Sequence, residues 1–226
     1  MGIKEKYQVR SIDKEQTKEW LLYKHYAGTI PGIMYAFGLY DDRLILQGVC
    51  CYGTSANNHN NELGDFKQIE LVRLVKNENL EKNILSWFLS QTFTFLQKPL
   101  SLISYADEGK NHHGYIYQAT NWIYTGLSGG VDFYIDEKQN EIHSRIMSDY
   151  RKKYPNMSRE QIADMLKWKK EKGTYKHRYF YFLGNKRDKK QWLKQLTEKY
   201  KIEKYPKGDN INYDASYKTI SQGLLF

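Results

Sequence analysis

The sequence has little of what marks several common protein classes. Its 226 residues include two cysteines, the adjacent Cys50 and Cys51, so there is no disulfide framework, and the pair cannot complete a zinc site alone. Four prolines are too few for a Pro-rich linker protein. No stretch approaches the roughly 18 apolar residues of a membrane span, and residues 1–16 lack the apolar core of a signal peptide. We therefore expect a protein of the reducing cytoplasm, without a membrane partner.

The sequence is rich in aromatic and basic residues. Aromatic residues make up 15% of the chain, with 20 Tyr, and the formal net charge is +9. Residues 148–226 hold 20 Lys and Arg against 9 Asp and Glu, whereas residues 1–147 hold 15 against 17. A basic, aromatic-rich surface is typical of nucleic-acid binding, although net charge also serves solubility. We expect an enzyme-like body over 1–147 and a basic helix–strand–helix part over 148–226, packed on the same domain and facing a polyanion.

The pattern of apolar residues predicts a mixed α/β layout. Asp13 and Gln16 form a capping-box variant before a helix, and the Asp41-Asp42 turn predicts a hairpin of strands 33–40 and 43–53. The other expected elements are a strand at 66–76, a helix at 84–98, a buried strand at 100–107, a short helix or turn at 115–122, a helix over 158–173, a strand at 177–184 and a basic helix from 186.

The unit formed by strand 66–76, helix 84–98 and strand 100–107 suggests an anion site. A helix that crosses over between two parallel strands places its N-terminus beside the sheet. The free N–H groups of that end can hold an anion such as a pyrophosphate. The same layout occurs in the acyl-CoA-binding acetyltransferase fold, and also in many other α/β proteins.

Short strings in a fixed order carry a closer resemblance, of which SYAD (104–107) followed by YQATNW (117–122) is the most specific. The others are HYAGTIPG (25–32), FGLY (37–40), ELVRLV (70–75), SWFLS (86–90), IHSR (142–145), KHRYFYFL (176–183) and YPKG (205–208). Over roughly residues 20–208, the chain resembles the Mom family of bacteriophage DNA-modification proteins. These acetyltransferase-fold enzymes convert adenine in DNA to an N6-carbamoylmethyl form, which shields phage DNA from host restriction.

The resemblance implies a GNAT-type mixed sheet flanked by helices, with a basic C-terminal extension. It implies an acetyl-CoA-binding enzyme that acts on double-stranded DNA in the host cytoplasm, with no obligatory protein partner. The product contains an acetamide unit, which simple acetyl transfer would not give. Two alternatives stay open: an ordinary N-acetyltransferase acting on a protein or small molecule, and a catalytically inert DNA-binding accessory protein. The loop 77–83, NENLEKN, favours the inert protein, because acetyltransferases typically hold the pyrophosphate with a Gly-rich loop there.

The resemblance also implies roles for individual residues. Asp107 would accept a proton, and Tyr117 would stack on a flipped adenine or donate to it. The expected catalytic residues are Asp107, Tyr117, His25 and Tyr26. The expected cofactor-binding residues are Arg73, Leu74, Val75, Asn83 and Ser86. The expected DNA-binding residues are Lys186, Arg187, Lys189, Lys190 and Arg178.

Most of these residues also have a structural interpretation. Arg73 could form a salt bridge with Glu70 or Asp107, and Asp107 could cap the following helix. His25 could interact with a helix dipole, and Ser86 could bond back to its own helix.

A metal site is the weakest of the hypotheses. His112, His113, Asp107 and His143 could together hold an iron ion, but their spacing in the sequence is not distinctive. Loop histidines are more often solvated than metal-bound.

Overall fold

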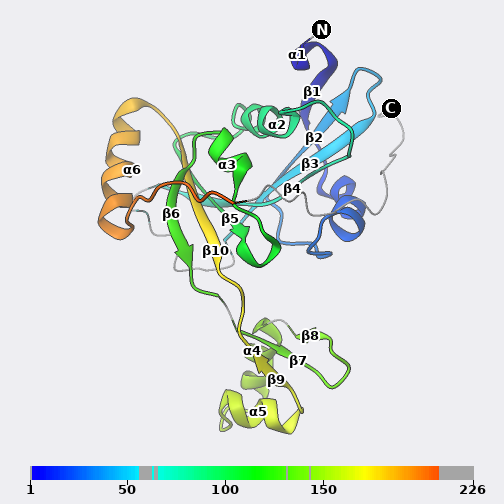
Figure 1. Cartoon of the computed structure of the whole chain (residues 1–226), viewed down its shortest axis with the longest axis vertical. Helices are drawn as coiled ribbons and strands as arrows, with labels where there is room; N and C mark the ends of the chain where they lie inside the picture. Colours follow the sequence, from blue (N-terminus) through cyan, green and yellow to red (C-terminus); the bar gives the residue numbers. More distant parts are fainter. Residues whose placement is uncertain (1, 56–62, 64–65, 131, 143, 209–226) are drawn as a thin grey trace.

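The computed structural model describes residues 2–55, 63, 66–130, 132–142 and 144–208. A seven-stranded sheet in the order β1-β2-β3-β4-β5-β10-β6 is its centre (Figure 1). All neighbouring strands in it are antiparallel except β4 and β5, which are parallel. The expected mixed α/β fold with helices flanking a central sheet is thus confirmed.

The boundaries of the elements agree with most of the sequence-based expectations, including the hairpin at Asp41-Asp42. The strands of the large sheet are β1 (Tyr7–Ser11), β2 (Tyr35–Asp41), β3 (Leu46–Gly53), β4 (Gln68–Lys76), β5 (Leu100–Asp107), β6 (Ile123–Ser128) and β10 (Lys176–Leu183). The helices around it are α1 (Ile3–Lys6), η1 (Lys14–Thr17), η2 (Trp20–Lys24), α2 (Ile84–Thr92), η4 (Glu108–Lys110), α3 (Tyr115–Ala119) and α6 (Lys186–Lys199).

Helices cover both faces of the sheet because successive strand residues point to opposite sides. Leu102 packs in the core beneath α2 and α3, whereas its neighbour Ile103 packs beneath α6 on the other face. The Trp192 side chain anchors α6, since it is fully buried and its Nε1 donates to the Ser101 hydroxyl at 2.9 Å. Each large apolar side chain buried in this way contributes about 1.5–3 kcal/mol.

Two helices are shorter than the sequence predicts. The helix expected over 84–98 ends at Thr92, where the Thr92 and Thr94 hydroxyls donate to main-chain carbonyls of the preceding turn, a local bonding that competes with helix propagation. The helix expected over 158–173 ends at Met165, because Lys167 takes a left-handed φ of 55° and the chain continues as a strand. A capping box formed by Ser158 and Gln161 begins this helix.

Residues 132–171 form a second unit between β6 and β10. It is a three-stranded sheet in the order β8-β7-β9 with two helices, and it stands off the large sheet (Figure 1). Its elements are β7 (Phe133–Ile135), β8 (Glu141–Ile142), α4 (Ser144–Lys153), α5 (Arg159–Met165) and β9 (Lys169–Glu171). We call this unit the insert.

The insert changes the expected division of the chain. The boundary expected between 147 and 148 falls inside α4, and residues from both sides of it contribute to each sheet. The charged residues are also distributed differently from the expected division at residue 148. The insert holds 9 Lys and Arg against 8 Asp and Glu, whereas residues 172–208 hold 12 against 3. The basic excess of the described residues therefore lies on the main body, over β10, α6 and the segment after it.

None of the helices in the described part of the chain is both long and apolar enough to cross a membrane.

Candidate active site

A cavity opens where β4 and β5 separate. Their parallel pairing covers only Gln68–Glu70 with Ser101–Ile103. Just beyond, the pairing of β4 with β3 shifts register, the signature of a bulge, which bends a strand. The Leu71 carbonyl of β4 accepts a hydrogen bond from the Ser104 hydroxyl at 2.9 Å. The separated edge of β4 thus leaves main-chain groups that no neighbouring strand pairs.

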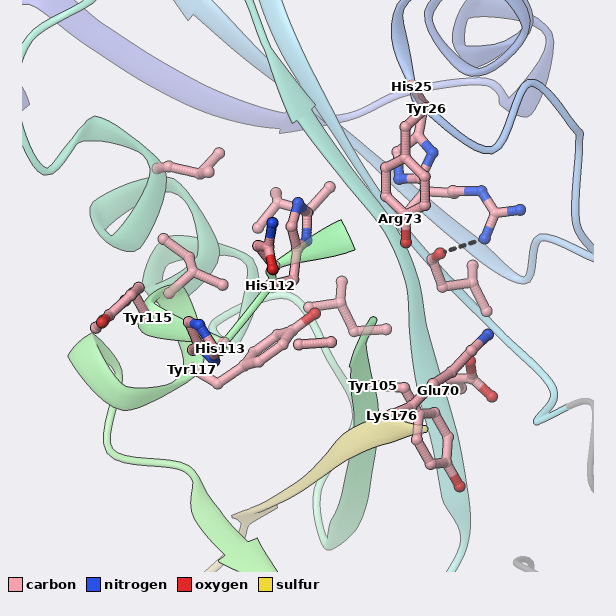
Figure 2. Close-up of a pocket in the computed structure, with 18 residues that line it drawn as sticks. His25, Tyr26, Glu70, Arg73, Tyr105, His112, His113, Tyr115, Tyr117 and Lys176 are labelled. Carbon is pink, nitrogen blue, oxygen red and sulfur yellow. Dashed lines mark hydrogen bonds between the residues drawn. The ribbon is translucent and has the colours of Figure 1, made fainter. Parts of the chain in front are cut away.

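Residues far apart in the sequence meet in this cavity, which has a volume of about 400 Å³. Figure 2 shows its 18 lining residues, with His25, Tyr26 and Arg73 on one side and His112, His113, Tyr115 and Tyr117 across from them. Glu70, Tyr105 and Lys176 lie together at a third corner. Five residues implied by the resemblance, His25, Tyr26, Arg73, Leu74 and Tyr117, are therefore brought together.

His25 and Tyr26 form one wall as a stacked pair, with ring centroids 4.5 Å apart. The rings of Tyr26 and His112 meet in an edge-to-face arrangement, with their centroids 5.5 Å apart. The Ala27 N–H donates to His25 Nδ1 at 3.1 Å, so the neutral ring carries its proton on Nε2. Burial, and then the charges of Arg73 and His112, lower the pKa of His25 to about 3. His25 is therefore a neutral hydrogen-bond donor at physiological pH.

Tyr117 is held by packing and by one hydrogen bond. Its ring lies 5.0 Å from that of Tyr179 and 5.2 Å from that of Trp122, between ring centroids. Its hydroxyl is 2.8 Å from the Ser104 hydroxyl. The Ser104 hydroxyl is the donor in this bond, as it is toward the Leu71 carbonyl, so the proton of the Tyr117 hydroxyl is left for a group in the cavity. Burial raises the pKa of Tyr117, so its hydroxyl stays protonated.

Arg73 is fixed by neutral partners. Its Nη1 donates to the Val72 carbonyl at 2.7 Å and its Nη2 to the Thr29 hydroxyl at 3.0 Å. Among the described residues it forms no ion pair within 4.0 Å, and its buried Nε has no hydrogen-bond partner. The salt bridge considered from the sequence is therefore not seen, and the guanidinium charge is available to an anionic group in the cavity.

Asp107 does not belong to the cavity wall. Its Oδ1 accepts from the Gly109 N–H at 3.0 Å and from the Thr174 hydroxyl at 2.8 Å, so it caps η4. Its carbonyl accepts from the His112 N–H at 3.1 Å, which helps to place the His112 ring. The cap considered as its structural interpretation is present, and its role as a proton acceptor remains a prediction.

The carboxylate that does line the cavity is Glu70, which the sequence suggested only as a partner for Arg73. Tyr105 and Lys176 were missed altogether. The sequence gives little sign of Tyr105 and Lys176 as site residues, because their place in the cavity depends on where β4 and β5 separate and not on the residue types.

The loop 77–83 compensates for its lack of glycine. Asn79 and Asn83 take left-handed φ values of 56° and 66°, a conformation that Asn adopts more readily than most residues. Two ion pairs hold the loop: the buried Lys24 contacts Glu78 at 2.7 Å, and Lys6 contacts Glu81 at 2.9 Å. The chain can therefore make the required bends without glycine.

The expected cofactor-binding residues are only partly in place. Arg73 and Leu74 line the cavity, and so does Leu85 in the first turn of α2. Val75 is buried in the core on the other side, and the Ser86 hydroxyl bonds back to the Asn83 carbonyl at 2.9 Å. The separated edge of β4 and the first-turn N–H groups of α2 nevertheless fit a cofactor with an amide chain and a pyrophosphate.

Four of the five expected DNA-binding residues are exposed on one helix. Lys186, Arg187, Lys189 and Lys190 occupy the first turns of α6. Positive charges at a helix N-terminus oppose the helix dipole, so helix stability does not explain this placement. Arg178 is different: its Nε donates to the Thr125 hydroxyl at 2.9 Å, and its guanidinium stacks 4.1 Å from the Tyr200 ring centroid.

The segment 201–208 leads from α6 back to the cavity. The Tyr205 hydroxyl donates to the Trp122 carbonyl at 2.6 Å, and the Tyr115 hydroxyl donates to the Gly208 carbonyl at 2.6 Å. Tyr115 itself lines the cavity. Exposed basic residues continue along this segment, namely Lys201, Lys204 and Lys207.

Within the described ranges, no group of three or more His, Cys, Asp or Glu is placed to hold a metal ion. His143 of the hypothetical iron set lies outside them. Cys50 and Cys51 are free and buried in β3.

Comparisons with known proteins bear on both fold and family. No curated protein matches this chain in sequence. Among solved structures, Arabidopsis thaliana NAA60 in complex with a bisubstrate analogue is similar, with a TM-score of 0.49, 10% identity and coverage of 79% of this chain and 98% of that one. An N-acetyltransferase from Staphylococcus aureus Mu50 is similar with a TM-score of 0.44, 10% identity and coverage of 78% and 97%.

The family comparison covers nearly all of the described chain. Residues 6–207 match the Mom protein family, a range that includes both walls of the cavity, α6 and the segment that follows it. The chain therefore belongs to the Mom protein family.

Proposed function

We propose that this chain is a transferase that modifies the exocyclic amine of adenine in double-stranded DNA. The product is the N6-carbamoylmethyl form that the family resemblance implies. The observation that carries the proposal is the meeting of His25, Tyr26, Arg73 and Tyr117 in one cavity at the separation of β4 and β5. An adenine must leave the base stack to reach such a cavity, and aromatic walls suit a flipped base.

The amine of adenine is a poor nucleophile because its lone pair is delocalised into the ring. Transfer needs a new bond from N6 to a donor carbon, loss of one N6 proton, and a leaving group that departs with its bonding electrons. The neutral His25 ring, the Tyr117 hydroxyl and the Arg73 guanidinium are hydrogen-bond donors. They would stabilise negative charge that develops on the donor during transfer.

The cofactor implied by the resemblance is acetyl-CoA. Arg73, Leu74 and the first turn of α2 would hold it, and when bound it supplies a two-carbon unit activated as a thioester. Direct transfer of its acetyl group to N6 gives N6-acetyladenine. The carbamoylmethyl group is instead joined through a CH₂ carbon and contains one more nitrogen. The mass of the modified nucleoside therefore distinguishes the two kinds of donor chemistry.

The basic residues of α6 and of 201–208 would hold the DNA backbone. Lys and Arg bind phosphates through charge, with little dependence on base sequence. Because Gly208 of this basic segment hydrogen-bonds to Tyr115, which lines the cavity, a duplex held along the segment would present its bases near the site. An ordinary N-acetyltransferase has no need of such a surface.

Resistance to restriction tests the proposal. DNA from cells that express the chain should resist restriction enzymes that require unmodified adenine, and DNA from cells expressing Tyr117→Phe should be cut normally. Full cleavage of DNA from the wild-type cells would contradict the proposal. Calorimetry of the purified chain with millimolar acetyl-CoA tests the cofactor separately. The absence of heat or thermal stabilisation would point to a different donor or to the inert accessory protein.

A further inference from the structure

The cavity is rich in hydrogen-bond donors. Burial raises the pKa of Tyr26 and of Tyr117, so both hydroxyls keep their protons. Burial lowers the pKa of His25 to about 3, so its ring holds a proton poorly, and burial lowers the pKa of His112 as well. Arg73 is a cation. The two hydroxyls, the His25 ring and the Arg73 guanidinium are therefore not suited to remove a proton from an amine at neutral pH.

Glu70 is different from all of them. Among the described residues that line the cavity, it is the only one with a carboxylate. It occupies the last position of β4 that pairs with β5, opposite Ile103, so its place is fixed by the sheet just before the strands separate. The Asp107 carboxylate, in contrast, is turned to the Gly109 N–H and the Thr174 hydroxyl outside the wall.

The surroundings of Glu70 suit the recognition of a base. Tyr105 and Lys176 lie beside it at the same corner of the cavity (Figure 2). Burial, and next the charge of Glu70, raise the pKa of Tyr105, so the Tyr105 hydroxyl also remains a donor. The Glu70 carboxylate has several lone pairs, so it can accept from these donors and also from the amine hydrogens of a bound base.

We infer that Glu70 binds the exocyclic amine of the flipped adenine and accepts its proton during transfer. As the bond from N6 to the donor carbon forms, the bond from that carbon to its leaving group breaks, and the leaving group takes the electron pair. N6 gives one proton to the Glu70 carboxylate, which later releases it to water. The step needs no oxidant or reductant when the donor carries its leaving group on the carbon that becomes bonded to N6: the carbonyl carbon of acetyl-CoA, with its thiolate, would give N6-acetyladenine, and the carbamoylmethyl product needs a donor with a leaving group on its CH₂ carbon. The inference rests on the proposed function and names the residue that carries out its proton transfer.

The same contact would select among bases. Adenine and cytosine present an amine at this position, whereas guanine and thymine present a carbonyl oxygen. A carbonyl oxygen facing the Glu70 carboxylate would be repelled and would offer it no hydrogen. Glu70 therefore accounts for the rejection of guanine and thymine, and the size of the cavity must separate adenine from cytosine.

Conservative substitutions of Glu70 test this inference. Gln keeps the shape and one hydrogen-bond acceptor but cannot take a proton, whereas Asp keeps the carboxylate and moves it back by one methylene group. The fraction of modified adenine in cellular DNA should fall at least about 100-fold in Glu70→Gln and less in Glu70→Asp. Thermal unfolding and DNA binding should match those of the wild type. Glu137→Gln, which removes an exposed carboxylate of the insert, is the matched control and should modify DNA normally.

The outcomes separate the two claims. If the wild type modifies no adenine, the proposed function fails whatever the Glu70 variants do. If the wild type is active and folded Glu70→Gln is equally active, or is more active than Glu70→Asp, the role of Glu70 is overturned and the proposed function stands. Activity in the order wild type, Glu70→Asp, Glu70→Gln supports the inference.

Discussion

The hydroxyls of Ser104 and Tyr117 lie 2.8 Å apart at the point where β4 and β5 separate. Ser104 also donates to the Leu71 carbonyl, the acceptor on β4 just past the last paired residue. The same side chain thus satisfies the main chain of the separated strand and fixes the orientation of a cavity residue. Loss of the Tyr117 hydroxyl should therefore affect the site more than the fold.

Tyr117→Phe keeps the ring and its packing against Tyr179 and Trp122. We expect the free energy of unfolding to fall by only about 0.5–1.5 kcal/mol, the usual contribution of one hydrogen bond, because Ser104 still donates to Leu71. The fraction of modified adenine should fall about 100-fold or more, the typical cost of losing a donor in an active site. Urea unfolding and nucleoside analysis measure the two effects. A variant with full activity would remove Tyr117 from the site.

The ion pair of Lys24 and Glu78 holds the loop before α2. The Lys24 side chain is 0% exposed, whereas that of Glu78 is 35% exposed. Glu78→Gln leaves a buried ammonium facing a neutral amide, so it should cost about 3 kcal/mol in the free energy of unfolding. Lys24→Met leaves only a partly solvated carboxylate and should cost less. Asp149→Asn, in an exposed pair with Lys152, should change stability by at most about 1 kcal/mol. Equal costs for all three would contradict the structure.

The buried His25 predicts a loss of stability in acid. Its folded pKa is about 3, below the ordinary value of 6.5, chiefly because of burial. Between those two pH values the unfolded chain binds more protons, so the free energy of unfolding falls as the pH is lowered through this window. His112 and His177 act in the same direction, since burial lowers their pKa as well. His25→Gln should show a shallower decline in urea unfolding, and an unchanged decline would contradict the burial of His25.

The basic residues of α6 predict a strong dependence of DNA binding on salt. Replacing Lys186, Arg187, Lys189 and Lys190 by Gln should lower the slope of log K against log salt by about 0.9 for each phosphate that the helix no longer neutralises. The matched control removes the same charge from the insert, at Arg151, Lys152, Lys153 and Lys167, and should change the slope much less. Equal effects of the two sets would mean that only net charge matters.

Local signals made most of the fold predictable from the sequence. The Asp41-Asp42 turn, the capping box at Asp13 and the strand expected at 66–76 each depend on neighbouring residues, and each was confirmed, the strand as Gln68–Lys76. The insert was not foreseen, because its sheet joins β9 to β7 across two intervening helices. Pairing between distant short strands leaves little trace in local periodicity.

The site was predictable only in part, for a related reason. Five of the residues expected from the resemblance to the Mom family do meet in the cavity, namely His25, Tyr26, Arg73, Leu74 and Tyr117. Asp107 was expected there, but its carboxylate is engaged by Thr174, 67 residues away in the sequence. Glu70 was overlooked because its role depends on where β4 and β5 separate, and no pattern within β4 alone shows that position.

Mass analysis of nucleosides from DNA of cells that express the chain tests the central claim most directly. We predict N6-carbamoylmethyladenine in the wild-type sample and its loss with Glu70→Gln and Tyr117→Phe. N6-acetyladenine in its place would keep the transferase and its DNA substrate but change the donor chemistry. Unmodified adenine throughout, from a folded chain that binds duplex DNA, would contradict the account.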